Sequence, residues 1–338
     1  MKRCDKYAVD LLYNWKGSYH AGSKARNDVS RTLEELGYKN VGIRHRNYKS
    51  KAFTSFIRKL QIIWLYYSHL ATAQIVIFQY PGVISHWLLK KLKKKGCRII
   101  MLIHDIESIR EERCFNEKEI FNYADNIISH TKNMTNTLVD NGVNSSIHEI
   151  YIFDYYVKEE NVHQEKDLTS IAFCGNLGKS HFIYELDNSK WQIHTYLYGI
   201  DCNTEFTNAN LEYMGKFESD DISSLKGAWG LVWDGNSPES CDTTPIGRYL
   251  RFNSSHKVSL YIVAEKPLIV WNKSALAEFV TDKGLGIAID SLYNIDIRIR
   301  NITKEEYGQF LLNIRELKKS LVNGEILKSA IKSIEHYV

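Results

Sequence analysis

The sequence predicts an α/β protein with two doubly wound halves of similar length. Short apolar runs rich in β-branched residues alternate with longer helical patterns, which is typical of parallel sheets that are buried on both faces. The alternation lapses once, in the polar stretch VKEENVHQEKDL at residues 157–168, and then resumes. At 338 residues, with 44% hydrophobic and 25% charged side chains, the chain has the size and composition of two ordinary globular domains.

The first half contains five predicted strands. They are expected at residues 7–12, 73–80, 97–103, 124–129 and 149–153. Helical patterns separate several of them and are clearest at residues 23–36 and 84–95. We therefore expect residues 1–157 to form an N-terminal Rossmann-like domain.

The second half repeats this organisation. Its strands are expected at residues 170–174, 191–198, 230–233, 268–271 and 284–289. The last segment, residues 303–336, is helical with few breaks. We expect residues 168–318 to form a C-terminal Rossmann-like domain and residues 319–338 to form a C-terminal helix.

The composition excludes several classes of protein. A net charge of +4 is too small to indicate a nucleic-acid partner. The six cysteines are scattered without a CxxC pair, which favours free thiols in a reducing cytoplasm over a disulfide framework. The N-terminus lacks the apolar core of a secretory signal, and no apolar run reaches transmembrane length. We therefore expect a soluble cytoplasmic protein, not a periplasmic sugar-binding protein.

Doubly wound sheets bind ligands beyond the carboxyl ends of their strands, so the residues after each strand are the candidates. Asn14, Gly17 and Ser18 follow the first strand and precede a helix. Glycine backbone and a helix N-terminus suit an anion there, although a plain turn with a helix cap accounts for the same residues. The segment has neither a dinucleotide fingerprint, which an epimerase would need, nor a Walker A loop.

The third strand is followed by His104, Asp105 and Glu107. A carboxylate and an imidazole at the end of a strand are candidates for proton transfer. A helix cap next to a histidine is the alternative. Asp105 and Glu107 are the only metal-like pair here, and no His or Cys cluster has metal-ligand spacing, so we expect no metal.

The loop GNLGK follows the first strand of the second half. Gly175 and Gly178, on either side of Asn176 and Leu177, offer open backbone and Lys179 offers a cation, a combination that suits a phosphate. Asp234 follows the strand at residues 230–233.

A second anion site is predicted in the stretch NSSHK. Ser254 or Ser255 can cap a helix that begins at His256, which places Lys257 in its first turn. The helix dipole disfavours a cation at this position, so Ser255, His256 and Lys257 indicate a site for a bound anion. A solvated lysine with its aliphatic stem on the core is the alternative.

Two segments of the first half could contact a membrane. The stretch FIRKLQIIWLYY, residues 56–67, is apolar, aromatic and partly basic, and LLKKLKKK, residues 88–95, contains five lysines. Both suit an anionic lipid surface if the acceptor is lipid-linked. The alternative is a core helix together with a solvated helix face.

The chain resembles the bacterial galactofuranosyltransferases of O-antigen synthesis, which have the GT-B fold. The motifs that carry the resemblance are SKARND (23–28), HDIESIR (104–110), ADNIISHTKNMT (124–135), IFDY (152–155), GNL (175–177), GLVWDGNSPESC (230–241) and the run from 249 to 280. More distantly, the chain is similar to the glucosyltransferases that extend the first sugar on serine-rich adhesins of streptococci. This second group shares the IHD and GN features.

The resemblance implies a metal-independent, inverting enzyme that needs no cofactor. Its two Rossmann-like domains would face each other across a cleft, and its last helix would cross back to the N-terminal domain. Lys179 and Lys257 would hold the diphosphate of the donor, with the loop from Asn14 to Ser18 closing over it. The adhesin group has arginine in place of Lys179, so a bidentate phosphate contact is lost here.

Inverting sugar transfer needs a base for the acceptor hydroxyl and positive charge for the leaving diphosphate. The chain has no DxD motif to hold a metal, so lysines and a helix N-terminus must supply that charge. For the base we favour Asp105, followed by His104 and then Glu107.

The closer resemblance implies transfer of galactofuranose from UDP-galactofuranose to a sugar hydroxyl, expected on a terminal glucose, of a lipid-linked surface polysaccharide or O-antigen repeat. Such an enzyme would work at the inner face of the plasma membrane. One alternative is a UDP-glucose-dependent glucosyltransferase that acts on an adhesin or polysaccharide glycan. Another is a non-catalytic GT-B-like partner subunit, against which the two lysines argue. The distant group forms oligomers, which implies a homo-oligomer.

Overall fold

The computed structural model describes residues 5–10, 21–43, 49–82, 84–158, 161–163, 165–186, 191–203, 205 and 208–336. The chain divides into two compact units. Unit 1 contains Met1–Gly17, Arg26–Ile150 and Leu327–Val338, and unit 2 contains Ser18–Ala25 and Tyr151–Ile326.

Unit 1 is built on a sheet of six parallel strands in the order β2-β1-β3-β4-β5-β6. The strands are β1 (Lys6–Asp10), β2 (Lys39–Gly42), β3 (Ile75–Tyr80), β4 (Arg98–Ile103), β5 (Asn126–Ser129) and β6 (Ser146–Glu149). The chain steps from β1 to β2 in one direction and then returns to β3 on the other side of β1. The point at which the strand order reverses, the switch point, therefore lies between β1 and β3.

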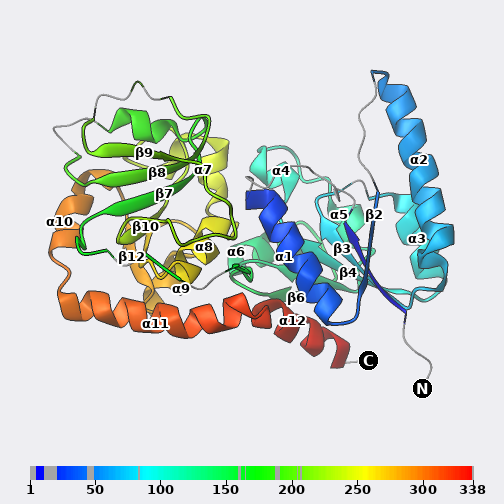
Figure 1. Ribbon diagram of the computed structural model, residues 1–338. Coiled ribbons are helices and arrows are strands. Elements are labelled where there is room, and N and C mark those ends of the chain that lie inside the picture. Colours follow the sequence, from blue (N-terminus) through cyan, green and yellow to red (C-terminus); the bar gives the residue numbers. More distant parts are fainter. Residues whose placement is uncertain are drawn as a thin grey trace. The chain divides into compact units, whose positions relative to one another are not determined.

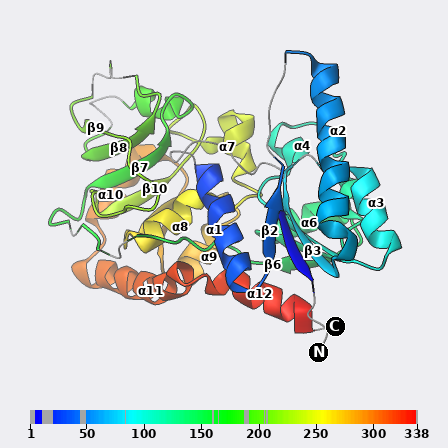
Figure 2. The same cartoon turned by 45° about the vertical axis from the view of Figure 1, so that its right-hand side comes forward.

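Helices cover both faces of this first sheet, which is why β3 is buried along its whole length. The helices in this part of the chain are α1 (Ala21–Glu35), α2 (Lys51–Ser68), η1 (Leu70–Thr72), α3 (His86–Lys94), α4 (Glu107–Arg110), α5 (Lys118–Phe121) and α6 (Lys132–Asp140). Figures 1 and 2 show α2 and α3 on one face of the sheet and α1 on the other.

Unit 2 contains a second sheet of six parallel strands, in the order β12-β11-β10-β7-β8-β9. The strands are β7 (Ile171–Asn176), β8 (Thr195–Ile200), β9 (Leu211–Gly215), β10 (Trp229–Val232), β11 (Leu268–Trp271) and β12 (Gly286–Ile289). The helices are η2 (His181–Glu185), η3 (Cys241–Thr243), α7 (Pro245–Tyr249), α8 (His256–Val263), α9 (Ala277–Asp282), η4 (Leu292–Asn294), α10 (Ile295–Arg300) and α11 (Lys304–Val322). The switch point of this sheet lies between β7 and β10.

The last helix, α12 (Glu325–His336), belongs mainly to unit 1 although it follows unit 2 in the sequence. The carboxylate of Glu335 accepts hydrogen bonds from the Lys6 ammonium at 2.7 Å and from the Tyr38 hydroxyl at 2.5 Å. Lys328 forms an ion pair with Glu35 at 2.8 Å. The predicted return of the C-terminal helix to the first domain is therefore confirmed.

Most of the predicted strands are confirmed, and the exceptions have a physical reason. The run at residues 149–153 was expected to be a strand, but β6 ends at Glu149. Its apolar residues Ile152 and Phe153 are instead buried in an irregular segment. The strands β2 and β9 lie at sheet edges and carry partly exposed residues, so neither shows the apolar run by which a buried strand is recognised.

Within the described ranges, no helix has the length and apolar character needed to cross a membrane.

A substitution at Gly230 would test how α8 packs on the second sheet. A Cβ at this position of β10 would lie 2.2 Å from the ring of Tyr261, which is fully buried and whose hydroxyl bonds to the backbone of Leu231 and Cys174. Because that ring cannot move aside, Gly230→Ala should lower the free energy of unfolding by about 1–3 kcal/mol. Urea denaturation followed by tryptophan fluorescence would measure the loss.

Gly308 in α11 provides the matched control, because a Cβ there would meet no described atom within 4 Å. Gly308→Ala should raise the unfolding free energy by about 0.5–1 kcal/mol, as expected for alanine in a helix interior. Equal stability of Gly230→Ala and the wild type would contradict the packing described here.

Candidate functional site

Three residues from separate predicted motifs meet at the switch point of the second sheet. Gly175 lies near the end of β7, Asp234 follows β10, and Lys257 lies in the first turn of α8. The Lys257 ammonium donates to the Asp234 carboxylate at 2.8 Å. A Cβ on Gly175 would lie 3.3 Å from Cε of Lys257, so the glycine leaves room for the lysine stem.

The Lys257 ammonium is held in place from several sides. Besides its ion pair with Asp234, it donates to the backbone carbonyl of Trp233 at 3.4 Å and lies 5.3 Å from the centre of the Phe173 ring. Its side chain is only 14% exposed. The counter-charge that a first-turn cation requires is therefore supplied by Asp234 from within the chain. The position of Lys257 does not by itself require a bound anion.

The start of α8 is as predicted, with Ser255 as its N-cap residue in an extended conformation. Within the described residues, the Ser255 side chain makes no capping hydrogen bond to the first turn. The first N–H groups of a helix point beyond its N-terminus, where they can bind an anion. The combination of these N–H groups with the Lys257 ammonium gives this end of α8 the chemistry of a phosphate site.

Aromatic residues fix the start of α8. The His256 ring stacks on Tyr155 with ring centres 4.9 Å apart and forms a T-shaped pair with Phe153. The Ser259 hydroxyl donates to the Phe153 carbonyl at 2.6 Å. On the Tyr155 ring lies the ammonium of Lys24, 4.7 Å from the ring centre.

Lys24 and Tyr155 were not among the predicted site residues. Both lie in sequence motifs that carry the family resemblance, SKARND and IFDY. Lys24 is buried and also donates to the Tyr156 carbonyl at 2.5 Å. A buried lysine next to an aromatic pair could have been identified only from the tertiary contact.

The GNLGK loop differs from its expected form. The Asn176 side chain accepts from the Lys179 backbone N–H at 3.1 Å and donates to Asp201 at 2.9 Å, which fixes the loop, and the Lys179 side chain is exposed. The helix that follows is η2, a five-residue 3-10 helix. So short a helix has little dipole, so this loop contributes the Lys179 cation instead of a helix N-terminus.

The switch point of the first sheet is occupied by Arg26 of α1. Its guanidinium donates to the carboxylate of Asp10, the last residue of β1, at 2.7 Å and to the carbonyl of Pro81, just after β3, at 2.5 Å. The ion pair is almost fully buried. The predicted residues of the neighbouring loop, Asn14, Gly17 and Ser18, lie outside the described residues.

His104, Asp105 and Glu107 follow β4 as predicted. The His104 ring nitrogen Nε2 is bonded to the side-chain oxygen of Gln79 at 2.8 Å, and Asp105 forms an ion pair with Arg110 at 3.0 Å. Glu107 is exposed at the start of α4, whose N-cap residue is Ile106. Asp105 therefore does not hold the N-cap position that the alternative hypothesis gave it.

A buried carboxylate that was not predicted supports this segment. Glu117 accepts hydrogen bonds from the backbone N–H of Ser108 at 2.9 Å and from the Ser108 hydroxyl. Burial, together with the charge of Glu117, raises the pKa of Tyr80 far above its usual range. The cluster fixes the segment that follows β4, so its role is structural.

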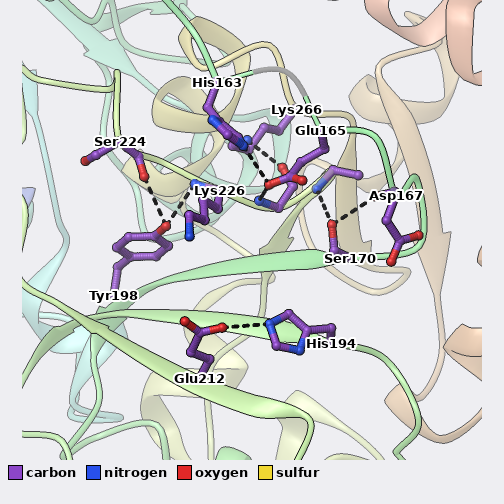
Figure 3. Close-up of polar contacts among 12 residues, drawn as sticks. His163, Glu165, Asp167, Ser170, His194, Tyr198, Glu212, Ser224, Lys226 and Lys266 are labelled. Carbon is purple, nitrogen blue, oxygen red and sulfur yellow. Dashed lines mark hydrogen bonds and ion pairs between the residues drawn. The ribbon is translucent and has the colours of Figure 1, made fainter.

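A second polar cluster lies at the amino ends of the strands in unit 2 (Figure 3). Glu165 accepts from the Gly227 N–H at 2.8 Å, and the Lys266 ammonium donates to the Gly227 carbonyl at 2.5 Å. His163 lies 3.2 Å from the Glu165 carboxylate. Ligands of such sheets bind at the carboxyl ends of the strands. We therefore assign this cluster a structural role, which is to hold together the segments that precede the strands.

Comparison with known proteins identifies the family. Residues 6–152 match the N-terminal domain of the Glucosyltransferase 3-like family, and residues 171–334 match its C-terminal domain. The chain belongs to this family. It is therefore a glycosyltransferase, and the resemblance predicted from its motifs is confirmed.

Among its relatives is the Escherichia coli (strain K12) protein beta-1,6-galactofuranosyltransferase WbbI. The two are 29% identical over 332 residues, which is 93% of this chain and 94% of the relative. Glucosyltransferase 3 of Streptococcus gordonii is 24% identical over 340 residues, covering 96% of this chain and 97% of the relative.

Solved structures confirm the GT-B fold. An E. coli trehalose-6-phosphate protein bound with UDP-2-fluoro glucose matches with a TM-score of 0.59 at 11% identity, covering 98% of both chains. An alpha-glucosyltransferase in complex with UDP-glucose and DNA containing an abasic site matches with a TM-score of 0.57 at 10% identity, covering 98% of this chain and 100% of the other.

Lys266 gives a prediction for the pH dependence of stability. Burial lowers the pKa of its ammonium from 10.5 to about 8. Between these values the unfolded chain binds a proton that the folded chain does not, so the contribution of Lys266 to stability rises with pH. The unfolding free energy of the wild type, relative to Lys266→Met, should increase by about 3 kcal/mol from pH 8 to pH 10.5. Urea denaturation at several pH values would measure this.

Lys283→Met, which removes an exposed lysine, is the control for the loss of one positive charge. If the difference in unfolding free energy between the wild type and Lys266→Met stays constant with pH, the ammonium of Lys266 is not destabilised by burial.

Proposed function

We propose that this protein is an inverting glycosyltransferase that transfers galactofuranose from UDP-galactofuranose to a hydroxyl of a saccharide acceptor. The observation that carries the proposal is the Lys257 ammonium at the switch point of the second sheet, next to Gly175 and the start of α8. The choice of donor rests on the similarity to a relative named as a beta-1,6-galactofuranosyltransferase.

In this proposal the donor diphosphate binds at the N-terminus of α8. Ser255 and His256 lie at the start of the helix, and Lys257 supplies one cation, oriented by Asp234. Lys179, on the loop after β7 with Asn176, supplies a second. Two lysines and helix N–H groups stabilise the charge that develops on the leaving UDP, which gives the chain a way to work without a metal cofactor.

The acceptor is activated by a base after β4. Asp105 is the favoured group because of its position directly after β4, where the ion pair with Arg110 would orient its carboxylate toward the acceptor hydroxyl. The acceptor oxygen then attacks the anomeric carbon while the bond to UDP breaks on the opposite face, which inverts the configuration. His104 and Glu107 remain the alternative bases.

The proposed acceptor is a lipid-linked surface polysaccharide or O-antigen repeat that ends in glucose. A UDP-glucose-dependent glucosyltransferase is the second candidate, favoured by the match over nearly the whole chain to a protein named Glucosyltransferase 3. A non-catalytic partner subunit is the third, and the ordered Lys257–Asp234 pair argues against it because an idle site has no need of a positioned cation.

Release of UDP by the purified protein tests the donor. The substrates are UDP-galactopyranose, with and without the mutase that forms the furanose, and UDP-glucose, each with an alkyl glucoside as acceptor and without added metal. We expect turnover only with the mutase present. Turnover with UDP-glucose alone would move the protein to the second candidate. If no donor releases UDP, the acceptor remains the unknown, and a UDP titration then separates an enzyme without its acceptor, which binds UDP, from the third candidate, which does not.

The variant Lys257→Ala tests whether UDP release depends on the proposed diphosphate site. Removal of one charged hydrogen bond to the diphosphate should weaken UDP binding about ten- to hundredfold and abolish turnover. Lys283→Ala, which removes an exposed lysine after α9, should leave both unchanged. Calorimetric titration with UDP would measure the affinity, and equal affinity in the two variants would contradict the assignment of Lys257.

Asp105→Asn tests the catalytic base. The amide keeps the size of the side chain but cannot take the proton, so kcat should fall about 10²–10⁴-fold while UDP affinity is retained. His104→Gln and Glu107→Gln are the matched variants for the alternative bases. Steady-state kinetics of all three would identify the base, since the loss of kcat should be largest for the residue that accepts the proton.

A further inference from the structure

The outer face of α2 carries a stripe of exposed apolar side chains. They recur at helical spacing and are Phe53, Phe56, Leu60, Ile63, Trp64 and Tyr67. Trp64 is 60% exposed and Tyr67 is 67% exposed. The opposite face of the same helix packs on the sheet through Ile62 and Leu65. A helix that carries apolar side chains on both faces is normally buried against other apolar groups on both faces.

The neighbouring helix α3 extends this surface. Figures 1 and 2 show α3 next to α2, and the rings of Tyr66 and Trp87 meet edge to face with centres 5.5 Å apart. Trp87 is exposed, and the Lys91 ammonium lies 5.9 Å from its ring centre. Leu88, Leu89 and Leu92 anchor α3 in the core. We name the apolar stripe of α2, together with Trp87 and the exposed lysines of α3, the α2–α3 face.

The charge on this part of the chain has a single sign. Residues 36–104 contain thirteen Lys and Arg and no Asp or Glu, in a protein whose total net charge is only +4. On α3, Lys90, Lys91 and Lys94 are exposed, and Lys59 is exposed on α2. Aromatic residues flanked by lysines, without acids, suit the boundary between the headgroups and acyl chains of an anionic bilayer.

We propose that the α2–α3 face docks the enzyme on an anionic lipid surface. The aromatic side chains of Trp64, Tyr67 and Phe56 insert at the boundary between the headgroups and the acyl chains. The lysines of α3 contact lipid phosphates. This inference rests on exposure and charge within unit 1 and does not depend on the proposed donor or acceptor. A saccharide acceptor carried on a lipid would be presented to the enzyme at the same surface.

A second copy of the chain is a poorer occupant of the α2–α3 face. A two-fold contact would bring together two faces whose exposed charges include Lys59, Lys90, Lys91 and Lys94. Like charges that are brought together at an interface oppose association. An anionic bilayer neutralises this charge and buries the apolar stripe at the same time.

Vesicle flotation with the full chain tests the proposal. We expect the wild type to float with vesicles of phosphatidylglycerol and phosphatidylcholine, and not with vesicles of phosphatidylcholine alone. Phe56→Ser/Trp64→Ser should reduce the partition onto anionic vesicles by about tenfold or more, since two half-exposed aromatic side chains no longer enter the lipid. Lys90→Glu/Lys91→Glu should reduce it by at least about fivefold per lysine.

Matched variants control for the loss of apolar side chains and of charge. Ile297→Ser/Leu312→Ser removes two equally exposed apolar residues of α10 and α11, and Lys132→Glu/Lys283→Glu reverses two exposed lysines elsewhere. Both should partition like the wild type. Circular dichroism and sedimentation velocity would verify the fold and the oligomeric state of each variant.

Two outcomes would overturn the proposal. One is a wild type that floats no better with anionic than with neutral vesicles. The other is a wild type that forms oligomers without binding vesicles and becomes monomeric as Phe56→Ser/Trp64→Ser, which would make the α2–α3 face a protein interface. UDP release would be unaffected by either outcome, so the lipid surface and the proposed function are tested separately.

Discussion

The reversal of strand order between β7 and β10 is the constraint from which the candidate site follows. Since β8 continues the sheet on one side of this pair and β11 on the other, the segments after β7 and β10 diverge. Gly175 and Asp234 therefore lie at the same point of the sheet, and the first turn of α8 places Lys257 there. The first sheet repeats the arrangement, with Arg26 between Asp10 and Pro81.

The two cations at these switch points are suited to different tasks. Arg26 is enclosed by a carboxylate and a backbone carbonyl, and its ion pair is almost fully buried, so it stabilises the joint between β1 and β3. Lys257 has one carboxylate partner and a glycine beside its stem, at a helix start fixed by the stack of His256 on Tyr155. A cation that is positioned by packing before a ligand binds needs little reorganisation, which suits the role proposed for Lys257.

The sequence could predict what depends on local pattern. Apolar runs predicted β3, β4, β10 and β11, and motif position brought Gly175, Asp234 and Lys257 to one point. The sequence could not reveal that Asp234 supplies the counter-charge of Lys257, because an ion pair between a loop and a helix 23 residues apart has no local signature. The edge strands β2 and β9 were missed because half-exposed strands lack an apolar run. Lys24 and Tyr155 were missed for a similar reason, since their contact joins segments more than a hundred residues apart.

The attachment of α12 to unit 1 has a consequence for how the protein is made. Ile331 and Ile334 are fully buried, and Glu335 bonds to Lys6 and Tyr38, so residues from both ends of the sequence complete one unit. A ribosome releases the C-terminal end last, after all of unit 2 has been synthesised. Until this helix has been synthesised, Lys6, Glu35 and Tyr38 of unit 1 lack their partners on it. Unit 2, continuous from Tyr151 to Ile326 apart from eight N-terminal residues, can close before unit 1 does.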